Sequence, residues 1–114
     1  MAKHDHASFL PLGASAFHVL LALADGERNG AAIAAEVEDE TRGGIRLMPG
    51  ALYRYLKQML ADGWIAESVA SSDDGRCKFY RLTPRGRSVA QAEARRLELV
   101  VQRARERRLL AAGA

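Results

Sequence analysis

Four side chains with hydrogen-bonding ends lie close together near the middle of the chain. They are Tyr53, Arg54, Lys57 and Gln58. Arginine and lysine can bind phosphates or the acceptor atoms of guanine, glutamine can pair with adenine, and tyrosine hydroxyls commonly bond phosphate. The small residues Gly50 and Ala51 come just before them and would let a helix N-terminus approach an anion closely. Their types therefore suit contacts with a phosphate-rich partner.

These side chains fall on one face of an expected helix from Pro49 to Gly63. Proline suits the first helical position, and glycine suits the left-handed residue that ends a helix. An apolar stripe at helical spacing comprises Leu52, Tyr55, Leu56, Met59 and Leu60, and the opposite side holds Ala51, Arg54, Lys57, Gln58 and Ala61. This helix alone fits an ordinary surface helix with solvated charges equally well, so its surroundings must decide.

The composition predicts one folded domain with an uneven charge. The chain has 114 residues, 48% of them apolar and 27% charged, and a net charge of +3. These are ordinary values for a globular domain, and the length allows one core but no separate catalytic domain. Positions 1–83 hold nine Lys/Arg against eleven Asp/Glu, whereas 84–114 hold eight Arg against three Glu. The last part of the chain is therefore strongly basic.

The sequence has no pattern typical of an enzyme, a metal protein or a membrane protein. A lone cysteine, Cys77, forms no intramolecular disulfide and no metal-binding spacing, which favours a reducing, cytoplasmic location. No apolar run has the length of a signal peptide or a membrane span. His4, Asp5 and His6 could bind a metal ion only weakly, because they lie on an expected tail without a fourth ligand. No catalytic residues, metal or cofactor are expected.

The order of expected elements is typical of a winged helix-turn-helix. Helices are expected at 14–24, from Asn29 or Gly30 to about Thr41, and at 49–63; a very short strand is expected at 45–47, and longer strands at 64–69 and 77–82. Asp74-Gly75 favours a tight turn between the last two strands. In this fold the third helix enters the major groove and the hairpin, or wing, lies along the backbone. Arg76 and Lys78 would then be wing contacts, so 10–83 is expected to be a DNA-binding domain of mainly α (α+β) class.

The final helix is expected to mediate dimerisation. Thr83 and Pro84 predict its start, and it can run to about Leu110. A heptad seam of mostly small residues is formed by Ala90, Ala94, Leu97, Val101 and Ala104. A helix this long cannot be covered by so small a domain, which favours a symmetric homodimer, although it could instead fold back over the first helix. Residues 84–110 are thus expected to be a dimerisation helix, with tails at 1–9 and 111–114.

Several motifs together resemble the PadR-like transcriptional regulators over roughly residues 10–110. They are Asn29-Gly-Ala-Ala-Ile33, Pro49-Gly-Ala-Leu-Tyr-Arg-Tyr-Leu-Lys57, Asp62-Gly-Trp-Ile65 and Lys78-Phe-Tyr-Arg-Leu-Thr-Pro-Arg-Gly86. The resemblance implies a homodimeric DNA-binding protein, usually a repressor of an inverted-repeat operator. The single helix after the wing is similar to the small subgroup of the family. Some small members bind flat aromatic compounds between the dimer helices, but no aromatic residue follows Tyr80, so a stacked effector is not expected there.

A second function remains open from the sequence. Winged helices also serve as protein-binding modules, because fold does not fix function. In that alternative the Arg-rich final helix would dock on an acidic partner, without specific DNA binding. One continuous basic surface formed by the third helix and the wing would favour double-stranded DNA instead.

Overall fold

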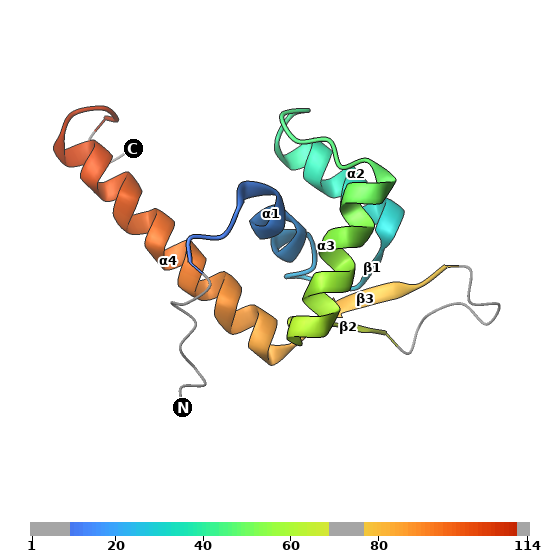
Figure 1. Cartoon of the computed structure of the whole chain (residues 1–114). Helices are drawn as coiled ribbons and strands as arrows, with labels where there is room; N and C mark the ends of the chain where they lie inside the picture. Colours follow the sequence, from blue (N-terminus) through green and yellow to red (C-terminus); the bar gives the residue numbers. More distant parts are fainter. Residues whose placement is uncertain (1–9, 69–76, 112–114) are drawn as a thin grey trace.

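The computed structural model describes residues 10–68 and 77–111 as four helices and three short strands (Figure 1). In chain order they are α1 (Ala14–Ala22), β1 (Arg28–Asn29), α2 (Gly30–Glu40), α3 (Pro49–Asp62), β2 (Ile65–Glu67), β3 (Phe79–Leu82) and α4 (Pro84–Glu106). The predicted order of three helices, a hairpin and a long last helix is confirmed, and this architecture is a winged helix-turn-helix. The predicted Asp74-Gly75 turn lies outside the described residues.

The apolar stripes of the first three helices meet in one core. Buried side chains come from every helix and from the sheet: Val19, Leu20, Leu23, Ile33, Val37, Leu52, Leu56, Met59, Trp64, Ile65, Tyr80 and Val89. The α3 stripe packs as predicted, since Leu52, Leu56 and Met59 are buried and the other two members pack against them at the edge. Burial of one side of α3 fixes which side faces solvent.

The sheet has the order β1-β3-β2, and both pairs are antiparallel. Ile65 pairs with Leu82 in the wing, and Arg28 pairs with Tyr80 on the other edge of β3. The predicted strand at 45–47 is wrong. Ile45 and Leu47 do pack against the core, as their alternation indicated, but the Ile45 N–H donates to the Thr41 hydroxyl at 2.9 Å and this segment lies in no sheet.

Local signals set the ends of α2 and α3. The Asn29 side chain accepts a hydrogen bond from the Ala32 N–H at 2.8 Å, which caps α2 as predicted. Gly63 ends α3 with φ of +77°, a conformation that glycine adopts without steric cost. The Trp64 N–H then donates to the Met59 carbonyl at 2.9 Å. The chain therefore turns directly from α3 into the wing.

Thr83 and Gly86 join the wing to α4. The Thr83 hydroxyl accepts from the Gly86 N–H at 3.0 Å and lies 2.7 Å from the Gly63 carbonyl, to which it donates. A Cβ atom on Gly86 would overlap the Trp64 carbonyl oxygen. Only glycine permits this approach, so α4 leaves the wing at a fixed place.

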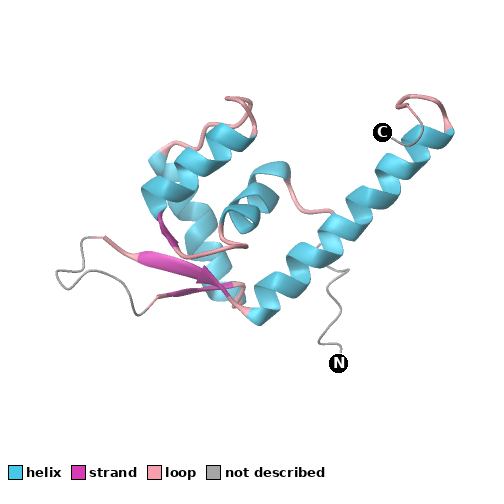
Figure 2. Cartoon of the chain, turned by 180° about the vertical axis from the view of Figure 1, so that it is seen from behind, coloured by secondary structure: helices cyan, strands magenta, loops and turns pink. Residues whose placement is uncertain are grey.

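The second half of α4 extends away from the other helices, as Figures 1 and 2 show from opposite sides. The helix ends at Glu106 rather than near Leu110, because Arg108 turns to φ of +63° and the Leu109 N–H donates back to the Ala104 carbonyl. Its first half packs against α1 and holds the segment before it. There Glu93 is 2% exposed, binds Arg96 through two contacts of 2.8 Å, and accepts from the Leu12 N–H at 3.3 Å.

Candidate nucleic-acid interface

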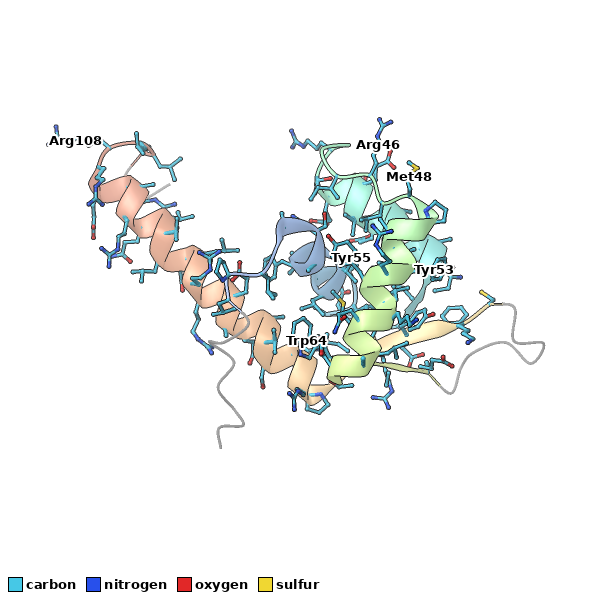
Figure 3. The ribbon with its side chains drawn as sticks, viewed as in Figure 1. Arg46, Met48, Tyr53, Tyr55, Trp64 and Arg108 are labelled. Atoms are coloured by element: carbon cyan, nitrogen blue, oxygen red, sulfur yellow. The ribbon has the colours of Figure 1, made fainter. Side chains whose placement is uncertain are left out.

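The solvent side of α3 carries the side chains that the sequence singled out. Tyr53, Arg54, Lys57 and Gln58 are all exposed, and Gly50 at the first turn is exposed as well. Ala51 is partly buried. In Figure 3, Tyr53 lies on the side of α3 toward β1 and β3, whereas Tyr55 lies on the side toward α1. Because the apolar stripe packs inward, the opposite side of α3 presents one polar face with two cations.

The two cations of this face are free to bind a partner. Within residues 10–68 and 77–111, neither Arg54 nor Lys57 lies within ion-pair distance of a carboxylate. The Gln58 amide differs, because its nitrogen donates to the Asp62 carboxylate at 3.2 and 3.3 Å. Gln58 must release this contact, or use its carbonyl oxygen, to pair with adenine as predicted.

The two predicted wing residues have different outcomes. Lys78 precedes β3, and its Nζ lies 3.5 Å from a Glu67 carboxylate oxygen on β2, with both side chains about half exposed. An exposed pair of this kind is weak and can exchange for a phosphate contact. Arg76 lies outside the described residues.

A group of residues at the junction of α2, α3 and β3 was missed from the sequence. Asn29 caps α2 and also donates from its amide to the Cys77 sulfur at 3.2 Å, which ties the start of α2 to the start of β3. The Tyr80 side chain is buried beside it and has a raised pKa, because burial first, and then the charges of Glu67 and Tyr53, disfavour its ionised form. A two-residue strand gives no sequence pattern, so the contact between 28–29 and 79–80 could not be found in advance.

The predicted seam of α4 divides into two parts. Ala90 packs against the protein's own core, whereas Ala94 and Val101 are exposed and Leu97 and Ala104 are partly buried. Leu99 and Val100, which the heptad pattern did not include, are each 51% exposed. At 3.6 residues per turn Val100 lies beside Leu97, Val101 and Ala104 and widens the predicted seam, whereas Leu99 lies on the opposite side of the helix.

The described residues also bear on metal binding and on membrane insertion. Among residues 10–68 and 77–111, His, Cys, Asp and Glu form no group of three that could hold a metal ion. His4 and His6 lie outside this range. No helix in the described ranges is both long and apolar enough to cross a membrane.

Comparisons of this chain with known proteins agree on one family. The model of the transcriptional regulator PadR-like family matches residues 19–92. Transcriptional regulator Rv3488 of Mycobacterium tuberculosis is 36% identical over 81 residues, which cover 71% of this chain and 73% of that protein. A match of this extent shows that the chain belongs to a family of transcriptional regulators rather than of enzymes, as the sequence predicted.

Solved structures show the same fold. A PadR family transcription regulator from Clostridium difficile R20291 superposes with a TM-score of 0.67 at 23% identity, covering 82% of this chain and 97% of that one. A point mutant of ZitR from Lactococcus lactis, in complex with DNA, superposes with a TM-score of 0.62 at 24% identity, covering 89% of this chain and 64% of that one. The predicted fold class and family are both confirmed. The chain thus belongs to the PadR-like family of transcriptional regulators, and its fold is the DNA-binding winged helix-turn-helix.

Proposed function

We propose that the protein is a homodimeric repressor that binds an inverted-repeat operator in double-stranded DNA. In this proposal α3 enters the major groove and the wing follows the backbone. The observation that carries it is the exposed face of α3, where Arg54 and Lys57 have no carboxylate partner in the described ranges. Lys78, on the neighbouring wing, extends this face with a third cation.

The proposed dimer uses the second half of α4. Val101 is 38% exposed and Val100, on the same side of the helix, is 51% exposed, and this half of the helix extends away from the other described elements. A large exposed apolar face on a helix supports burial against a second copy. Two copies related by a twofold axis would present two α3 helices, which matches an operator with two half-sites about 34 Å apart.

The test is DNA binding by α3 variants. We expect Arg54→Ala and Lys57→Ala each to weaken binding to the protein's own upstream DNA by roughly tenfold or more, since a lost phosphate or base contact costs about 1–3 kcal/mol. Each lost phosphate contact should also lower the slope of log affinity against log salt by about one. Fluorescence anisotropy over a salt series measures both effects.

The matched control is Arg95→Ala, which removes an exposed arginine from α4. Its affinity and melting temperature should stay close to those of the unmodified protein. If the unmodified protein bound DNA without salt dependence, or not at all at low salt, the repressor function would be wrong and the protein-binding alternative would gain support. If the α3 variants unfolded, the face would have been misplaced.

A further inference from the structure

A cavity of about 440 Å³ opens where the start of α2, the first half of α3 and the start of β3 meet. Its polar lining includes Asn29, Tyr53, Lys78 and Tyr80, and Gly30 and Ala31 at the start of α2 also line it. Lys78 contributes a positive charge, and no carboxylate belongs to this lining among the described residues. The composition of the lining favours an anionic occupant.

The first residues of α2 line this cavity. The first N–H groups of a helix have no partner within the helix, and they carry the positive end of the helix dipole. Asn29 satisfies the N–H of Ala32, which leaves Gly30 and Ala31 at the cavity wall. A helix start is a common place for a phosphate oxygen, but it becomes a specific site only with further groups.

Tyr80 is such a group. Its side chain is only 5% exposed, it lines the cavity, and its hydroxyl has no hydrogen-bond partner within residues 10–68 and 77–111. The hydroxyl oxygen itself is not fully enclosed, and it opens to the cavity, where a ligand can reach it. The usual pKa of a tyrosine hydroxyl, 10.0, is raised further here by burial, so the hydroxyl is protonated at neutral pH and can donate.

Tyr53 completes the arrangement from the α3 side. A Cβ atom on Gly30 would lie 3.0 Å from the Tyr53 hydroxyl oxygen, so this hydroxyl rests directly against the first residue of α2. Because Gly30 has no side chain, there is room for the Tyr53 phenol at this position. The cavity thus has donors from α2, α3 and β3.

We propose that this cavity seats one backbone phosphate of the DNA, which accepts hydrogen bonds from the Tyr53 and Tyr80 hydroxyls and from the start of α2. The inference rests on the proposed DNA-binding function. A DNA backbone is the fitting source of the phosphate because the cavity lies between the two elements, α3 and the wing, that would flank one strand. Lys78 would exchange its Glu67 contact for this phosphate.

The test combines a protein variant with a modified DNA. Tyr80→Phe removes only the hydroxyl and keeps the buried ring, so the fold should persist. We expect about a tenfold loss of affinity for DNA, because a hydrogen bond to a charged group is lost. Because the phenol is neutral, Tyr80→Phe should leave the slope of log affinity against log salt unchanged. Lys78→Gln removes a charge and should lower that slope by about one.

Single methylphosphonate substitutions along the operator then locate the phosphate. Each substitution removes one negative charge from the backbone. At one position in each half-site, Tyr80→Phe should cost no further affinity, because the interaction is already lost; at all other positions it should still cost about tenfold. This coupling would not arise if Tyr80→Phe acted only by loosening the wing.

Gly30→Ala provides a second variant with the ring hydroxyls intact. The added methyl should push the Tyr53 hydroxyl out of place and lower DNA affinity, while the melting temperature stays level or rises, since alanine favours a helix over glycine.

Two results distinguish a failure of the phosphate cavity from a failure of the DNA-binding function. If the unmodified protein bound DNA and Tyr80→Phe bound it equally well, or lost affinity equally at every methylphosphonate position, the phosphate cavity would be wrong and the DNA-binding function would stand. If the unmodified protein did not bind DNA, both would fall.

Discussion

At the residue scale, the fold depends on a few positions where only one side chain fits. Gly86 is the clearest, because it lies against the Trp64 carbonyl at the point where α4 leaves the wing. Thr83 reinforces the same point with its hydroxyl. Both residues belong to the Tyr-Arg-Leu-Thr-x-x-Gly segment that identified the family, so this part of the motif is structural and makes no contact with DNA in our proposal.

We expect Gly86→Ala to lower the free energy of unfolding by about 2–3 kcal/mol or more, because the backbone must move to admit the methyl group. Urea denaturation measures this change. Gly26→Ala is the control, since a Cβ atom there would meet nothing within 4 Å. An unchanged midpoint for Gly86→Ala would contradict the close approach to Trp64.

At the element scale, the buried Glu93 of α4 accepts a hydrogen bond from the Leu12 N–H, in the segment before α1, and pairs with Arg96 on its own helix. Glu93 is almost fully buried, and its hydrogen bonds from Arg96, with a smaller contribution from the Leu12 N–H, hold its pKa below the usual value of 4.5. A lowered pKa in the folded state means that the stabilisation is complete above the usual value. It is lost as pH falls below that value toward the folded-state pKa.

Glu93→Gln should therefore lower the free energy of unfolding at pH 7 by about 1.5–3 kcal/mol, the range for hydrogen bonds to a charged group. The difference between the variant and the unmodified protein should shrink steadily below about pH 4.5. Denaturation at a series of pH values tests this dependence. A difference that stayed constant down to low pH would show that Glu93 stabilises α4 without its charge.

At the scale of the whole molecule, one chain leaves the apolar face of α4 uncovered. Val100 and Val101 are exposed beside Leu97 on one side of a helix that extends beyond the core. The basic residues Arg103, Arg105, Arg107 and Arg108 follow this face, and they would surround the apolar contact in the dimer that we propose.

We expect Val101→Glu to shift the protein from dimer to monomer in sedimentation velocity, because it places a charge in the apolar contact. DNA affinity should fall strongly, because a monomer contacts only one half-site of the operator and loses the gain from binding two linked sites. Gln102→Glu adds the same charge to the neighbouring exposed position and should preserve the dimer. A dimeric Val101→Glu, or a monomeric unmodified protein, would contradict the proposed interface.

Much of this molecule follows from local patterns that the sequence displays. The α3 helix is defined by Pro49, Gly63 and a stripe of five apolar residues, and each acts within a few turns of the chain. The exposure of Tyr53, Arg54 and Lys57 follows from that stripe, because burying one side of a helix exposes the other. The sequence motifs were likewise sufficient for the family and the fold class.

Contacts between distant segments were decided only by the tertiary structure. Ile45 and Leu47 alternate like a strand, but no strand in the described part of the chain pairs with them. Arg28 and Asn29 show no strand pattern, yet they lie beside β3 and join the sheet. The cavity between α2, α3 and β3 has the same origin. Its walls come from positions some fifty residues apart, from Asn29 to Tyr80, and packing brings them together by long-range contacts that no local periodicity encodes.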